Sequence, residues 1–162
     1  MTENPYMVYP ATAQTHAEPG VKVMPMLFIN ELGQVCYGTV DFLPRQALAL
    51  HTHNTWELII VGGESEGPGF VFFDGQWWRA DPGAALFVPK GGIHAWSAGS
   101  HNGFKMLWVY QGSVQEAGRN WVEDRRPSPI ISPEEEKNAP VWTTEAGKRA
   151  AARMRQHPQR PG

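Results

Sequence analysis

The stretch LALHTHNTWELIIVGG, residues 48–63, contains the pattern that decides the fold and the chemistry of this chain. His51 and His53 lie two residues apart in a strand-like run, so both imidazoles point to the same face of the strand. A tight turn at Asn54 and Thr55 follows, and Glu57 begins the next apolar run. The carboxylate of Glu57 can therefore return to the two imidazoles, which predicts three metal ligands on adjacent strands.

A fourth candidate ligand comes from a distant part of the chain. His94 opens another strand-like run after the turn PKGG at residues 89–92. Three imidazoles and one carboxylate suit Fe(II), Mn(II), Ni(II), Co(II) or Zn(II), and an octahedral ion would keep one or two open positions for a substrate or O₂. A single histidine is more often structural than a ligand. Four suitable side chains at these spacings predict a site for one divalent transition metal.

Short apolar runs separated by turn residues predict an all-β fold. The 17 glycines and 14 prolines are spread among these runs, and the pairs Asp74-Gly75 and Pro82-Gly83 are strong turn signals. The predicted strands span residues 21–29, 34–42, 46–53, 56–61, 69–73, 76–80, 84–88, 93–98 and 104–110. Strands at this regular spacing favour a sandwich or a small barrel over an α/β fold.

The predicted strands occupy residues 21–112, and the segments on both sides differ in character. Residues 1–20 are polar and contain three prolines, so we expect an extended N-terminal arm. Residues 113–162 lack the strand pattern and include a stretch rich in proline and glutamate at 127–140. We expect a C-terminal arm or tail here, with a short helix near 144–155.

Composition and charge exclude several classes of protein. The longest apolar runs reach about eight residues, well short of the roughly 20 needed to cross a bilayer, and the basic-then-apolar order of a signal peptide is missing. Cys36 is the only cysteine, which excludes an intrachain disulfide and a thiolate cluster. Residues 1–123 carry 6 Lys and Arg against 11 Asp and Glu, which argues against nucleic acid as a ligand. We expect a soluble cytoplasmic protein that binds a small molecule and neither nucleic acid nor a membrane.

The candidate ligands resemble the two sequence motifs of the cupin superfamily. The first motif, G-x5-H-x-H-x3,4-E-x6-G, is matched at its centre by His51, His53 and Glu57, while Arg45 stands in place of its opening glycine. The second motif, G-x5-P-x-G-x2-H-x3-N, is matched by Gly83, Pro89, Gly91 and His94, with Ala98 in place of its asparagine. The resemblance covers residues 35–110 and implies a double-stranded β-helix, also called a jelly-roll barrel. It also implies that the four side chains named above are metal ligands.

Strand parity predicts which residues share the interior with the metal. If His51 and His53 face inward, Ala47 and Ala49 share that face, and Leu48 and Leu50 point outward. By the same rule Ile59 faces inward after Glu57, and Trp96 shares the face of His94. These residues, Ala47, Ala49, Ile59 and Trp96, are the predicted substrate pocket. An outward face with Trp56, Leu58 and Ile60 should be covered by a terminal arm or by a second copy, so we expect a homodimer.

Three functions agree with this pattern. The first is a dioxygenase, which the resemblance of this ligand set to that of cupin dioxygenases implies, with Fe(II) as the first metal expected. In it Fe(II) binds an enolate or catechol together with O₂, and Glu57 stays a ligand or detaches to act as a catalytic base. The second is a non-redox isomerase, epimerase or lyase that needs a further base, for which Tyr110, Lys105 and Lys90 are candidates. The third is a ligand-sensing cupin without turnover. The sequence leaves the substrate open.

Overall fold

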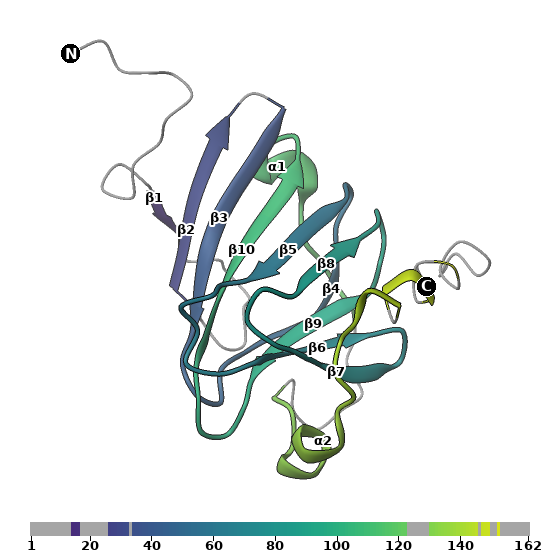
Figure 1. Cartoon of the computed structure of the whole chain (residues 1–162). Coiled ribbons are helices and arrows are strands. Elements are labelled where there is room, and N and C mark those ends of the chain that lie inside the picture. Colours follow the sequence, from purple (N-terminus) through teal and green to yellow (C-terminus); the bar gives the residue numbers. More distant parts are fainter. Residues whose placement is uncertain are drawn as a thin grey trace.

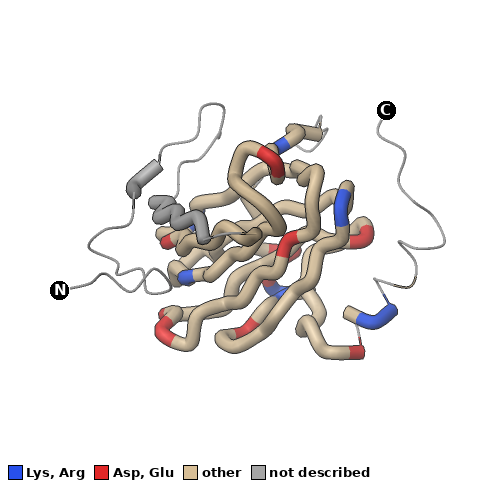
Figure 2. Tube along the Cα trace, turned by 90° about the horizontal axis from the view of Figure 1, so that it is seen from above, with Lys and Arg blue, Asp and Glu red and all other residues tan. Residues whose placement is uncertain are grey.

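The computed structural model of the chain describes residues 14–16, 26–32, 34–122, 130–145, 147–149 and 152. Two antiparallel β-sheets pack face to face and enclose one core, with the C-terminal segment along the outside (Figure 1). Among the described residues, no helix is long and apolar enough to span a membrane. Acidic and basic positions are interspersed along the described trace (Figure 2).

From β3 to β10 the chain crosses repeatedly between the two sheets, with only the hairpin β6–β7 kept in one sheet, as in a double-stranded β-helix. The six-stranded sheet has the order β1 (Gln14–His16), β2 (Met26–Leu32), β3 (Val35–Phe42), β10 (Phe104–Gln111), β5 (Glu57–Val61) and β8 (Ala85–Val88). The five-stranded sheet has the order β11 (Asn120–Trp121), β4 (Ala47–Thr52), β9 (His94–Ala98), β6 (Gly69–Phe73) and β7 (Gln76–Ala80). Two short helices, α1 (Val114–Ala117) and α2 (Pro133–Asn138), follow the barrel strands.

Turn chemistry placed the strand boundaries well. The hairpin between β6 and β7 turns at Asp74 and Gly75, whose φ angles of 53° and 83° are those of the expected tight turn. Arg45 also has a positive φ, 64°, which explains why the cupin motif has glycine at this position. Three strands differ from expectation. Strand β2 runs to Leu32, past the predicted strand end at residue 29, and β1 lies within the segment expected to be an extended arm. Strand β11 lies within the C-terminal segment that was expected to lack strands.

A β-bulge in β4 changes which of its residues face the interior. In the pairing of β4 with β9, Leu48 lies opposite Trp96 and His51 lies opposite His94, so β4 has one extra residue between the two pairs. Leu48 therefore shares the inner face with Trp96 and belongs to the main core, whereas Ala47 lies opposite Ser97 on the other face. The predicted inward Ala47 and outward Leu48 were wrong, because strict alternation does not hold across a bulge.

The C-terminal segment covers the outer face of the five-stranded sheet. Leu50 and Trp77 on this face pack in one apolar cluster with Ile131, and Trp142 packs against Phe73 of the main core. A parallel bridge between Arg79 and Val141 ties the segment to the edge strand β7. The described residues of the predicted helix at 144–155, namely 144, 145, 147–149 and 152, are helical.

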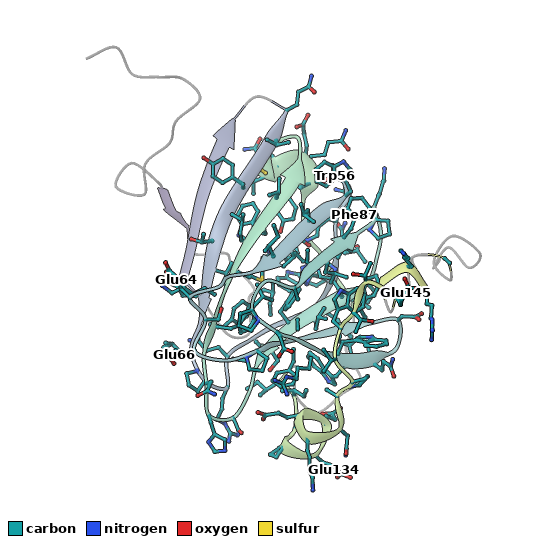
Figure 3. All side chains as sticks on the ribbon, viewed as in Figure 1. Trp56, Glu64, Glu66, Phe87, Glu134 and Glu145 are labelled. Atoms are coloured by element: carbon teal, nitrogen blue, oxygen red, sulfur yellow. The ribbon has the colours of Figure 1, made fainter. Side chains whose placement is uncertain are left out.

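The outer face of the six-stranded sheet keeps an apolar region at its edge. Trp56 and Phe87 stack with ring centroids 5.8 Å apart, and the two side chains lie together beside β5 and β8 (Figure 3). Phe87 is 54% exposed. This face has the apolar character that led us to expect a homodimer, and the homodimer stays a prediction.

Candidate metal centre

The four predicted ligands converge at one end of the barrel interior. His51 comes from β4, His53 and Glu57 flank the loop between β4 and β5, and His94 begins β9. Each residue offers one ligand atom, and these four atoms all lie within 4.8 Å of one another. This spacing is close to the distance of about 4 Å that separates two opposite ligand atoms when each metal–ligand bond is about 2.0 to 2.2 Å long. All four side chains are buried, with at most 3% of each residue exposed. The predicted cluster is therefore present in the fold.

Backbone carbonyl groups fix the orientation of all three imidazoles. The Nδ1 atom of each ring lies within hydrogen-bond distance of a carbonyl oxygen, at 2.7 Å for His51 and Ala49, 2.5 Å for His53 and Gly118, and 3.0 Å for His94 and Gly92. Because a carbonyl oxygen only accepts hydrogen bonds, Nδ1 carries the proton and donates it. The Nε2 atom of each neutral ring then presents a lone pair toward the centre, the arrangement that metal-binding histidines adopt.

The atoms that face the centre lack hydrogen-bond partners. The Nε2 atoms of the three histidines and Oε2 of Glu57 are buried without a partner. Glu57 Oε2 lies 2.8 Å from His94 Nε2 and 3.4 Å from His53 Nε2, so acceptor atoms face one another at short range. Buried acceptors in such contact are costly unless a cation lies between them. The residues present therefore fit a divalent metal ion.

The surroundings of Glu57 keep its carboxyl group ionised, as a metal ligand must be. Burial alone would raise the pKa of Glu57, but its contacts with His53 and His94 hold that pKa well below its usual range. Burial lowers the pKa of His51 well below 6.5, and the neighbouring His94 and His53 lower it further. Burial also opposes protonation of His53, yet the nearby Glu57 carboxylate raises its pKa above 6.5. The site thus contains an ionised carboxylate and, on His51, a neutral imidazole.

Tyr110 forms one wall of the site. It lies opposite Glu57 in the pairing of β10 with β5, and its ring centroid is 4.5 Å from that of His53 and 4.7 Å from that of Trp108. Burial raises the pKa of Tyr110 well above its usual value, and the charge of Glu57 and a hydrogen bond to that carboxylate raise it further. The phenol therefore stays protonated and presents an O–H donor beside the ligands. The structure favours Tyr110 among the three candidates named from the sequence, because Lys105 and Lys90 are both exposed.

A segment that the sequence did not indicate closes one side of the site. Trp121 in β11 lies opposite His51 in β4, with ring centroids 5.6 Å apart, and 40% of Trp121 is exposed. The guanidinium of Arg119 lies 5.5 Å from the centre of the Trp121 ring, and its Nε and Nη1 atoms are buried. No local pattern around residues 118–121 predicts their place, since it depends on the return of the chain from β10 to β4.

The other predicted pocket residues lie in the core. Ile59 and Trp96 are buried on inner faces, at 0% and 1% exposure, and both belong to the main core cluster. Ala49 lies at the bulge, where its carbonyl group holds the ring of His51. Contact of Ile59, Trp96 or Ala49 with a substrate stays a prediction.

Comparison with known families gives one match. Residues 35–140 match the family described as the AraC-like ligand binding domain, a range that includes both motifs and all four ligands. No curated protein matches the chain significantly.

Solved structures show the same fold at low sequence identity. A cupin-like protein from Thermotoga maritima is 15% identical with a TM-score of 0.58, over 80% of this chain and 95% of that one. The polyketide cyclase RemF from Streptomyces resistomycificus is 20% identical with a TM-score of 0.59, over 80% and 95%. The DMSP lyase DddQ from Ruegeria pomeroyi is 18% identical with a TM-score of 0.59, over 72% of this chain and 64% of that one. These similarities establish the fold.

Proposed function

The chain belongs to the family of AraC-like ligand binding domains and folds as a cupin, and we propose that it is a metal-dependent enzyme acting on a small organic substrate. One observation carries the proposal. Three Nε2 lone pairs and one carboxylate oxygen are buried together without hydrogen-bond partners, while each Nδ1 atom is held by a backbone carbonyl group. A protein with no use for a cation would gain stability from apolar side chains at these positions.

The first candidate reaction is dioxygenation with iron. A bound divalent metal supplies Lewis acidity, and iron in addition supplies the electron transfer that O₂ chemistry requires. The side chains of His51, His53, Glu57 and His94 would hold the metal, which would bind the substrate together with O₂. Glu57 supplies the one negative charge of the ligand set, and burial of the ligands keeps bulk water away from the reacting groups.

The second candidate is a non-redox reaction, and the position of Tyr110 favours it. Its protonated phenol lies beside Glu57 and His53, where it can donate a hydrogen bond or a proton to an oxygen atom of the substrate. Two proteins of similar fold carry the names polyketide cyclase and DMSP lyase. A lyase, cyclase or isomerase would use the same four ligands, with the metal as a Lewis acid.

One experiment separates these candidates. The protein is purified without oxygen, its metal is identified by elemental analysis, and oxygen uptake is recorded with diketones, catechols and thiols. Dioxygenation predicts iron together with substrate-dependent uptake that His51→Ala abolishes. Matched His101→Ala, at an exposed position, should leave uptake unchanged.

The other outcomes are equally specific. Zinc or manganese without uptake, but with metal-dependent conversion of substrate under nitrogen, would support the non-redox candidate. Metal-dependent binding without any conversion across the same panel would contradict an enzyme and indicate a sensor. A chain that holds no metal would refute the proposal itself.

A further inference from the structure

Residues Gly118–Trp121, called the strap below, are fixed along one side of the metal centre. The carbonyl oxygen of Gly118 accepts from Nδ1 of His53, and the side chain of Asn120 donates to Oδ1 of Asn54 at 3.0 Å. Just before the strap, the amide of Asn54 donates to the carbonyl oxygen of Ala117 at 2.7 Å. These bonds tie the strap to the loop that carries His53, so its side chains have fixed positions relative to the metal ligands.

Two side chains of the strap lie beside the centre. Trp121 lies opposite His51 in the pairing of β11 with β4, and directly paired residues share one face of a sheet. The guanidinium of Arg119, which precedes β11, lies 5.5 Å from the centre of the Trp121 ring. A partly exposed indole therefore lies next to the metal ligand His51, and a cation lies on that indole.

The charge of this region favours an anion. A divalent metal with one ionised carboxylate and neutral imidazoles leaves a net positive charge at the centre. Burial lowers the pKa of Arg119 to about 10, which still leaves the guanidinium charged at neutral pH. Among the described residues, Glu57 is the one acidic member of the ligand cluster, and its carboxylate faces the same centre as the three imidazoles. A negatively charged substrate group would reduce the repulsion between the two cationic groups.

We propose that Arg119 and Trp121 select a carboxylate-bearing substrate with a flat apolar body, which rests on the proposed metal-dependent function. The guanidinium binds the carboxylate, and the indole ring of Trp121 stacks on the body of the substrate. A guanidinium has five N–H donors, so Arg119 can bind a carboxylate in addition to its interactions within the chain. The substrate then enters beside His51 with its reactive end toward the ligands.

Calorimetric titration of the zinc-loaded protein with benzoate and with neutral benzamide tests this inference without turnover. Wild-type protein should bind benzoate at least tenfold more tightly than benzamide. Arg119→Gln should remove this preference, and Arg119→Lys should restore part of it. Trp121→Leu should weaken both ligands by a similar factor. Arg79→Gln is the matched control, because Arg79 is exposed and paired with Asp81, and it should behave as wild type.

The results distinguish this inference from the proposed function. The assignment of Arg119 would be overturned if wild type and Arg119→Gln bound benzoate equally, or if wild type bound no benzoate at millimolar concentration. The proposed function would still stand in that case, provided that the protein held its full metal content. Loss of metal from the wild-type protein would overturn the proposed function instead. Elemental analysis of each variant before titration, with Arg119→Gln expected to keep its zinc, separates the two failures.

Discussion

Nδ1 of His53 donates a hydrogen bond to the carbonyl oxygen of Gly118, 65 residues further along the chain. This bond joins a metal ligand of the first motif to a segment beyond the last barrel strand. Gly118 has φ 56° and ψ 171°, a conformation that residues with a side chain rarely adopt. The orientation of His53 therefore depends on a backbone geometry that glycine provides.

Gly118→Ala should weaken metal binding. A Cβ atom at this position would lie 2.8 Å from Nδ2 of Asn54, and the positive φ would be strained. The carbonyl group would shift, and loss of such support for a ligand costs about 10- to 100-fold in metal affinity. Competition with a chromophoric chelator measures the change. Gly63→Ala is the control, since nothing lies within 4 Å of its Cβ position, and an equal loss in both variants would contradict the role of Gly118.

Tyr110→Phe should separate metal binding from catalysis. The substitution keeps the ring between His53 and Trp108 and removes only the hydroxyl group beside Glu57. If the phenol donates a proton to the substrate, turnover should fall by about 10²- to 10⁴-fold while the metal content stays the same. Tyr37→Phe, on the outer side of β3, should have no effect. Full turnover in Tyr110→Phe would exclude the phenol as the acid.

Metal affinity should fall as the pH is lowered. Each Nε2 lone pair binds either a proton or the metal, so protons compete for the site. Burial opposes protonation of His53, but Glu57 raises its pKa above 6.5, so this competition begins near neutral pH, whereas Glu57 remains ionised. We expect an apparent Kd that is constant above about pH 8 and rises by up to about tenfold per pH unit below about pH 7. An affinity unchanged between pH 8 and pH 6 would contradict ligation by His53.

The apolar edge around Phe87 predicts a homodimer in solution. Phe87 is 54% exposed and stacks on Trp56, and half-buried Leu58 lies opposite it on β5 (Figure 3). Sedimentation should give a dimer for the wild type and a monomer for Phe87→Asp, because a buried charge opposes association. Leu43→Asp changes another exposed apolar residue and should remain dimeric. A monomeric wild type at tens of micromolar would refute this prediction.

The sequence was sufficient for the features that depend on local chemistry. Turn residues such as Asp74 and Gly75 placed the strand ends within a few residues, and the spacing of His51, His53 and Glu57 located most of the metal site. Ser113 and Glu116 form a capping box at the start of α1, and their spacing of three residues is the sequence signature of a helix N-terminus.

Other features depend on contacts between distant segments. The run at residues 47–50 is apolar on both faces, since its outer face is covered by Ile131, so no alternation of polarity marks the bulge that turns Leu48 inward. Gly118, Arg119 and Trp121 reach the site only because β11 pairs with β4. Their roles could not be derived from residues close to them in the chain.

Binding of one metal ion by three imidazoles and one carboxylate can be measured through the metal content of His94→Ala. Wild-type protein, His94→Ala and the control His101→Ala are equilibrated with excess zinc, desalted and measured by elemental analysis. We expect close to one zinc per chain in the wild type and the control, and less than about a tenth of that in His94→Ala. One tightly held zinc per chain in His94→Ala would show that its imidazole is not a ligand.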